Sequence, residues 1–479
     1  MAPTESNSEE RGGSPMVDWS TNPRSPIASR AEPDPASLAP PKHLITVRSE
    51  PGAVLIAQSI VGDLDGDGIG DLVLLGVELP ERSLGFRRDG SLDIDDLATT
   101  AHVFYGRTDM PATLRAADSD ARVRGHGFGL LIATPGAHPI GDLNGDGLAD
   151  LVLTKPDEAY FLFGDEARLS GDVDVEHVTA RWSFDTDPPK RKLAVVIAAG
   201  DVQNDGLSDV VLVFDPAEPH PGAPAPVSLL FTGRTERWPE RFGEASATAT
   251  FSAPDSVHGA RALDAGDLDG DGRSDLLFNL NGLPRLVLGS RRDLMGVVDV
   301  GGAETVSSEP LDLRLVDDLN GDGVDEFVWR SGGNSISLQY GAAATPSVHP
   351  DAPDLVVTGS GISLTSLTPS DFDGDGQADL IVSTSPGPNS PGGLYVVTEG
   401  QLRTSTRIDV DEEVPLLPWN DMRLAHEGRV FAANFVASVG AGADITGDGV
   451  HDVVAVIASS DPESIIESRV MIIPGGYEQ

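Results

Sequence analysis

The chain of 479 residues contains no cysteine, few aromatic residues and few basic ones. Without cysteine it cannot form a disulfide framework, a thiolate metal site or a lipid-modified N-terminal cysteine. No stretch approaches the roughly 18 consecutive apolar residues that a transmembrane helix needs. The 33 Lys and Arg residues stand against 76 Asp and Glu, for a formal net charge of −43. Such a surface argues against nucleic acid and anionic membranes as partners.

Sequence motifs of the common catalytic sites are also missing. There is no Gly-x-Ser-x-Gly nucleophile elbow, no Gly-x-x-x-x-Gly-Lys phosphate loop and no His-Glu-x-x-His zinc helix. We therefore assign no catalytic residue and no organic cofactor, and we expect a protein that binds in preference to one that catalyses.

The first 40 residues differ in composition from the rest. They are rich in Ser, Pro and Glu with almost no clustered apolar residues, which is typical of a disordered tail. Their start, Met-Ala-Pro-Thr-Glu-Ser, has no basic segment followed by an apolar core and so does not have the form of a secretory signal. We predict a tail over residues 1–40 and a single domain over residues 41–479.

What the chain has in abundance is one acidic loop. Nine residues of the approximate form Asp-x-Asp/Asn-Gly-Asp-Gly-x-x-Asp occur seven times, 51 to 79 residues apart. The copies, numbered here loops one to seven, begin at Asp63, Asp142, Asp201, Asp267, Asp318, Asp371 and Asp444. Spacing of this size is typical of repeats that each form one supersecondary unit.

The residue types in the loop suit a hard cation. Carboxylate or amide oxygens at positions 1, 3, 5 and 9 and a backbone carbonyl at position 7 can surround one ion, and the glycines allow left-handed turns. An all-oxygen, carboxylate-rich cage favours calcium over magnesium, so we predict up to seven calcium sites. The predicted ligands are Asp63, Asp65, Asp67, Ile69, Asp71; Asp142, Asn144, Asp146, Leu148, Asp150; Asp201, Gln203, Asp205, Leu207, Asp209; Asp267, Asp269, Asp271, Arg273, Asp275; Asp318, Asn320, Asp322, Val324, Glu326; Asp371, Asp373, Asp375, Gln377, Asp379; and Asp444, Thr446, Asp448, Val450, Asp452.

Two other structures contain loops of similar composition, the EF-hand and the hairpin turn. An EF-hand needs an acidic ligand at position 12, but that position holds Leu74, Leu153, Leu212, Phe278, Trp329, Val382 and Ala455. A single Asp-Gly loop is also typical of a simple hairpin turn. Seven copies in register with strands favour the cation cage.

Each loop is followed by short apolar runs. The first run comes at once, as in Asp71-Leu-Val-Leu-Leu75, and the second ends at or near a glycine, as in His102-Val-Phe-Tyr-Gly106. Short β-branched runs between turn residues are typical of buried strands. Each repeat therefore reads as strand, acidic loop, strand, turn, strand, turn, strand.

On these loops and strands the chain resembles the FG-GAP repeats of the integrin α-subunit head and their bacterial relatives. Phe128-Gly129, and Val103 to Arg107 followed by Arg124-Gly125, fit the spacer of the bacterial version, while the glycine-alanine-proline part is largely lost. The resemblance implies an all-β fold, a seven-bladed β-propeller with four-stranded blades. It also implies a surface or extracellular protein that binds a protein or a glycan.

Closure of the ring needs a strand from elsewhere. After loop seven the chain has room for only two more strands. The segment His43 to Arg48 alternates plausibly and precedes the first strand of blade one. We predict that it supplies the outer strand of blade seven.

Two functions remain open. The first is a calcium-binding, non-enzymatic adhesion or interaction module that works outside the cell and binds a protein or a glycan. The second is a propeller-based hydrolase or lyase acting on a polysaccharide or another extracellular substrate. Ionisable residues in the central channel would favour the enzyme, and small or apolar ones the binding module. We expect a monomeric propeller, with residues 78–101 and 401–432 as long loops that could carry recognition.

The seven loops are unequal in ligand charge. Loops one, four and six have Asp at positions 1, 3, 5 and 9, whereas loop three has Gln203 and Asn204 at positions 3 and 4, and loop seven has Thr446 at position 3. Because fewer carboxylates bind calcium more weakly, the count alone predicts that loops one, four and six fill first and loop three last.

Overall fold

The computed structural model describes residues 44–50, 52–78, 97–126, 137–177, 180–184, 191–217, 220, 223–253, 259–289, 294–342, 346–362, 367–385, 392–413, 415–418, 424–426, 429–431, 435–458 and 468–476. The chain divides into two units, residues 1–42 and residues 43–479. The predicted tail, the Phe128-Gly129 pair and residues 79–96 of the first long loop lie outside the described residues. Only the second unit is described below.

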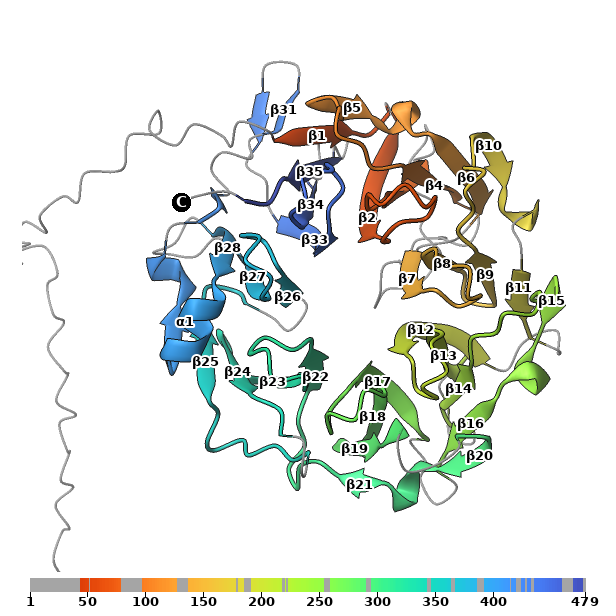
Figure 1. The fold of residues 1–479 in the computed structure, drawn as a ribbon, viewed down its shortest axis with the longest axis vertical. Helices are drawn as coiled ribbons and strands as arrows, with labels where there is room; N and C mark the ends of the chain where they lie inside the picture. The colour runs from red at the N-terminus through yellow and green to blue at the C-terminus, as the bar shows by residue number, and fades with distance from the viewer. Residues whose placement is uncertain are drawn as a thin grey trace, which may run out of the picture. The chain divides into compact units, whose positions relative to one another are not determined.

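Residues 43–479 form a seven-bladed, all-β propeller, as the sequence predicts (Figure 1). In every blade the acidic loop joins the innermost strand to the second strand, and a third strand ends near the predicted glycine. The innermost strands, from blade one to blade seven, are β2 (Ala53–Ile60), β7 (Ala137–Gly141), β12 (Arg191–Gly200), β17 (Arg261–Gly266), β22 (Leu313–Val316), β26 (Leu367–Ser370) and β33 (Phe435–Ala443). The second strands are β3 (Leu72–Glu78), β8 (Asp150–Thr154), β13 (Asp209–Pro216), β18 (Asp275–Leu280), β23 (Glu326–Gly332), β27 (Asp379–Thr384) and β34 (Asp452–Ala458). The third strands are β4 (Ala98–Phe104), β9 (Glu158–Leu162), β14 (Val227–Phe231), β19 (Leu283–Val287), β24 (Ser335–Gln339), β28 (Gly393–Val397) and β35 (Ser468–Ile473).

The second strands are apolar without alternation because both of their faces are covered. All five residues of β8 are buried, as are the first six of β3. The buried apolar side chains fall into seven clusters, and each cluster lies between two neighbouring blades. The core is therefore a ring of seven interfaces, in which each sheet contributes one face to each of two clusters.

The blades have four or five strands, so the prediction of four strands throughout was too low. The fourth strands are β6 (Ala121–His126), β11 (Ala180–Ser183), β16 (Ala249–Ser252), β21 (Glu304–Thr305), β25 (Leu355–Thr358), β30 (Leu417–Pro418) and β1 (Ile45–Arg48). Five blades gain a short fifth strand that runs parallel to the fourth and comes from the next repeat along the ring. These fifth strands are β10 (Gly171–Asp174), β15 (Arg241–Phe242), β20 (Gly296–Asp299), β29 (Arg407–Asp409) and β5 (Thr113–Arg115).

A short 3₁₀ turn follows each fifth strand and anchors it. The turns are Ala116–Asp118, Val175–His177, Glu244–Ser246, Val300–Gly302 and Val410–Glu412. In three of them an Asp-Val pair begins the turn, and the valine is buried between blades. Asp299, for example, accepts the N–H of Gly301 at 2.8 Å. Each such unit crosses from one blade to its neighbour on the outer side of the ring.

The remaining elements belong to the last repeats. The single α-helix described, α1 (Glu399–Thr404), follows β28 in blade six. A two-stranded hairpin is formed by β31 (Leu424–His426) and β32 (Arg429–Phe431). Within the second predicted long loop, residues 401–404, 407–412, 417–418, 424–426 and 429–431 therefore hold regular structure, while Trp419, Met422 and Arg423 lie outside the described residues.

The N-terminal strand lies at the outer side of blade seven. β1 pairs antiparallel with β35, with Ile45 opposite Ile472 and Arg48 opposite Arg469, and it also pairs with β5. Blades one and seven are joined at the loops as well, where Gly70 N–H donates to the Asp444 carbonyl at 2.7 Å. The loop contacts are a second link between blades one and seven that does not involve β1. That β1 holds the ring closed therefore stays a prediction.

Candidate metal centres

Backbone conformation gives the seven loops a shared shape. In loop one the glycines at positions 4 and 6, Gly66 and Gly68, have φ values of 78° and 84°. This left-handed region is open to glycine and is disfavoured for most other residues. Loop three keeps the shape with Asn204 at position 4, at φ 55°, since asparagine tolerates this conformation better than other side chains.

The carboxylates at positions 1 and 5 are fixed by the loop's own backbone. In all seven loops the N–H at position 6 donates to one oxygen of the position 1 carboxylate at 2.6–3.0 Å. The N–H at position 7 donates to one oxygen of the position 5 carboxylate at 2.9–3.0 Å. A carboxylate has about four acceptor sites, so these bonds orient the side chains and leave lone pairs for a cation.

The acid at position 9 has a structural role that the sequence did not reveal. It is at most 1% exposed in every loop. One of its oxygens accepts the N–H of position 2 at 2.7–3.2 Å. The other accepts an N–H from the end of the third strand at 2.8–3.5 Å. This carboxylate therefore clamps the loop to the rest of its blade.

Burial perturbs the acids at position 9. It raises the pKa of Asp71, Asp150, Asp209, Asp275 and Asp452 to about 7, although the backbone N–H groups that donate to each carboxylate act in the opposite direction. The same cause raises the pKa of Asp379 to about 6 and that of Glu326 to about 8. Neighbouring acids of the same loop add to the shift in each case. A bound cation would offset this repulsion.

Four loops bring three acidic ligand atoms within 4.8 Å of one another, among the residues that the structure describes. The groups are Asp63, Asp65 and Asp71; Asp267, Asp269 and Asp271; Asp371, Asp373 and Asp375; and Asp444, Asp448 and Asp452. Oxygens bound to one calcium ion at 2.3–2.6 Å lie no more than about 5 Å apart. The donor atoms and their spacing therefore fit calcium in loops one, four, six and seven.

The other three loops have an amide at position 3: Asn144, Gln203 and Asn320. No described trio of acidic side chains gathers there. Loop seven was ranked lower because of Thr446, whose hydroxyl donates to Asp452 at 3.3 Å. It forms a trio nonetheless because Asp452 takes part in place of position 3. The full predicted ligand sets, including the position 7 carbonyls, stay predictions.

Neighbouring loops are joined by backbone hydrogen bonds into a chain around one end of the propeller. In loops one to five the N–H of position 8 donates to the carbonyl of position 1 in the preceding loop, at 2.7–3.1 Å. Ala149 N–H, for example, donates to the Asp63 carbonyl at 2.8 Å. Perturbing one loop therefore also perturbs the loop beside it.

The close approach of the third strands to two joined loops explains the glycine found where these strands end. A Cβ on Gly164 would lie 2.8 Å from the Ala149 carbonyl oxygen and 2.9 Å from the Leu64 carbonyl oxygen. Those oxygens belong to loops of two different blades. Only glycine lets the strand end approach both of them.

Arginines from a neighbouring blade reach three of the loops, which the sequence did not suggest. Arg168 contacts the carboxylates of Asp65 and Asp67 in loop one. Arg273 donates to the Gln203 carbonyl in loop three at 3.3 Å, and Arg403 donates to the Asn320 carbonyl in loop five at 2.7 Å. No spacing rule links these residues to their loops, because Arg168 lies 101 residues after Asp67.

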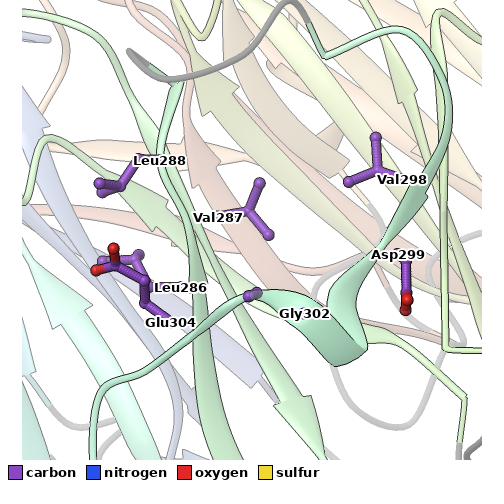
Figure 2. A pocket seen from close by; sticks show the side chains of 8 residues that line it. Leu286, Val287, Leu288, Val298, Asp299, Gly302 and Glu304 are labelled. Atoms are coloured by element: carbon purple, nitrogen blue, oxygen red, sulfur yellow. The ribbon is translucent and has the colours of Figure 1, made fainter.

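A cavity of about 170 Å³ lies away from the loops, at the outer side of blades three and four. Figure 2 shows Val287, the last residue of β19, and Val298 in β20 on two of its sides. Met295 and Val297, next to it along the chain, are 67% and 76% exposed and are the large apolar side chains most exposed among those described. The cavity lining has no basic residue among those described.

Comparisons with known proteins agree with the loops and the fold. Residues 318–382, from loop five to the strand after loop six, match the FG-GAP-like repeat. This match and the seven blades fit an FG-GAP-type repeat family. No curated protein matches the chain. No described helix is long and apolar enough to cross a membrane.

Several solved structures align with the chain at TM-scores below 0.5. BBS1N, solved in complex with ARL6DN, is 11% identical with a TM-score of 0.41, over 88% of this chain and 94% of that chain. An Agrocybe aegerita lectin that recognises non-reducing terminal N-acetylglucosamine is 13% identical with a TM-score of 0.34, over 78% and 88%. The V. cholerae biofilm matrix protein Bap1 is 12% identical with a TM-score of 0.25, over 88% of each chain. At these scores the similarity carries no information about function.

Proposed function

We propose that this protein is a calcium-binding, non-enzymatic interaction module that works outside the cell or at its surface and binds a protein or glycan partner. The observation that carries the proposal is the sevenfold repetition of one pre-oriented carboxylate loop, with three acidic ligand atoms brought together in four of the copies. Calcium bound there would neutralise repelling carboxylates and tie each loop in its folded shape. The ions would thus make the propeller a rigid scaffold.

The strength of such sites favours a compartment with abundant calcium. With a dissociation constant of about 0.1 mM, typical of extracellular modules, and about 1 mM free calcium, each site stabilises the fold by about 1.4 kcal/mol. Seven independent sites would total roughly 10 kcal/mol, comparable with the stability of an ordinary domain. At micromolar calcium the same sites contribute almost nothing, so the loops favour an extracellular or surface location.

The innermost strands support binding in preference to catalysis. Among their described residues, the positions that are not buried are mostly small or apolar, for example Ala194, Ala198, Ala265 and Leu315. The ionisable exceptions are Arg191, Lys192, Arg261, Asp264 and Arg314. One oxygen of Asp264, the acid among them, accepts the N–H of Leu315 at 3.0 Å. A side chain held in this way by the backbone is suited to structure more than to proton transfer.

Among the described residues, one part of the outer surface combines exposed apolar side chains with a cavity. Apolar side chains that adjoin one another on a surface are a possible interaction site, whereas isolated ones are common on any protein. Met295 and Val297 are exposed and adjoin the cavity of Figure 2. A contact there would leave the calcium loops free to act as structural supports.

The test is a pull-down and glycan-array screen in calcium and in excess chelator. The double variant Asp269→Asn, Asp373→Asn weakens loops four and six, and the exposed Asp351→Asn serves as a control for charge. We expect partner binding that needs calcium, is reduced in the double variant and is unchanged in the control. Partner binding of equal strength in chelator, in calcium and in the double variant would contradict the calcium role.

A further inference from the structure

Arg168 lies in a turn of blade two that is fixed directly on loop one of blade one. Asp165 N–H donates to the Leu64 carbonyl of loop one at 2.9 Å, and Arg168 N–H donates back to the Asp165 carbonyl at 3.1 Å. On the other side Leu169 N–H donates to the Tyr105 hydroxyl at 2.8 Å. Arg168 itself has a φ of 31°, an uncommon conformation for a residue other than glycine. The surrounding bonds hold the backbone there, and such a conformation often marks a functional position.

The guanidinium of Arg168 spans two acids of loop one. Its Nη2 lies 2.7 Å from Asp67 Oδ2, and its Nε pairs with Asp65 Oδ2. The Asp65 side chain is fully buried, whereas that of Arg168 is 49% exposed. The guanidinium carbon lies 5.0 Å from the centre of the Tyr105 ring, a cation–π distance that adds to its fixation.

These contacts place a positive charge between the side chains at positions 3 and 5, where a metal would bind. The arginines that reach other loops make different contacts. Arg273 donates to a backbone carbonyl of loop three, and Arg403 donates to the Asn320 carbonyl and to the Gln377 side-chain oxygen. Those oxygens are neutral, so neither arginine offsets loop carboxylates as Arg168 does.

Building on the proposed calcium binding, we propose that Arg168 is a tethered counter-cation of loop one. It takes the place of a metal between Asp65 and Asp67. Loop one therefore binds a metal more weakly than loops four and six, although its carboxylate count is the same. The inference changes the order of filling that the carboxylate count alone predicts.

Metal occupancy can be measured loop by loop through anomalous scattering from crystals soaked in graded terbium concentrations. In the unmodified protein we expect loops four and six to fill at lower concentrations than loop one. Arg168→Gln should lower the terbium concentration that fills loop one by up to about fivefold, and should leave the concentrations that fill loops four and six unchanged. Arg168→Lys keeps the charge and should lower the filling concentration of loop one by a smaller factor. The exposed Arg237→Gln, which removes the same charge elsewhere, should behave as the unmodified protein.

Loop one filling together with loops four and six, or unchanged in Arg168→Gln, would overturn the proposal. A second measurement, in chelator, needs no metal. Arg168→Gln should lower the melting temperature, and the loss should vanish in an Asp65→Asn, Asp67→Asn background. An equal loss in both backgrounds would overturn the counter-cation role. If every loop stays empty of terbium in every variant, the calcium proposal fails, and the chelator measurement alone then decides the role of Arg168.

Discussion

Replacing Asp150 with alanine should destabilise the protein by about 4 kcal/mol, with or without calcium. Asp150 occupies position 9 of loop two and is fully buried. Its two oxygens accept the N–H of Leu143 at 2.8 Å and the N–H of Gly164 at 2.9 Å. Each buried donor left without an acceptor costs about 1–3 kcal/mol, so losing both gives the value above.

Loop two suits this test because its position 3 is Asn144, which limits any contribution from a metal. The assay is urea unfolding in chelator and in calcium, with Asp146→Ala as the matched control. Asp146 is exposed and accepts the Leu148 N–H at 2.9 Å, so its loss should cost less than about 1 kcal/mol in chelator. A loss below about 1 kcal/mol for Asp150→Ala, or one that appears only in calcium, would refute the clamp role.

Three further predictions follow from the same contacts. Gly164→Ala should cost about 3 kcal/mol in urea unfolding because its Cβ would meet two backbone oxygens, whereas Gly302→Ala, with no atom within 4 Å of the new Cβ, should be nearly neutral. In chelator, the urea midpoint should fall as pH rises from about 4 to 7, because folding raises the pKa of Asp71, Asp150, Asp209, Asp275 and Asp452 from 3.8 to about 7 and the native state holds more protons there; a midpoint that rises over this range would contradict it. Deleting residues 1–50 should expose the edge of blade seven and promote aggregation, measured by light scattering, whereas deleting residues 1–38 should not; equal behaviour of the two truncations would mean that β1 does not close the ring.

The sequence was sufficient to predict the blades because each one contains the same loop and two apolar strands after it. It did not predict the fifth strands, since a strand such as β10 is short and mostly exposed and has no apolar pattern. The Asp-Val pairs at the start of three of the 3₁₀ turns are a sequence signal that could have predicted the fifth strands before them. Asp299 and Val300 are one such pair.

The chemistry of the loops was harder to predict from the sequence than the number of loops. Spacing alone predicts Asp71 as a ligand of the cage, but its burial and its bonds to two backbone N–H groups depend on how the third strand ends. Arg168 could not have been found, because its contact with loop one depends on the packing of blade two against blade one. Loop seven gathers three acids through Asp452 although Thr446 interrupts the motif.

The most direct test of calcium binding is the melting temperature of the full chain in calcium, in excess chelator and in chelator followed by calcium or magnesium. We expect a fall of many degrees in chelator, full recovery with about 1 mM free calcium and only partial recovery with magnesium. Chelation leaves three acids close together without a cation in loops four, six and seven, whereas Arg168 still contacts two acids of loop one. A melting temperature that does not change in excess chelator would mean that the seven loops are hairpin turns and not calcium sites.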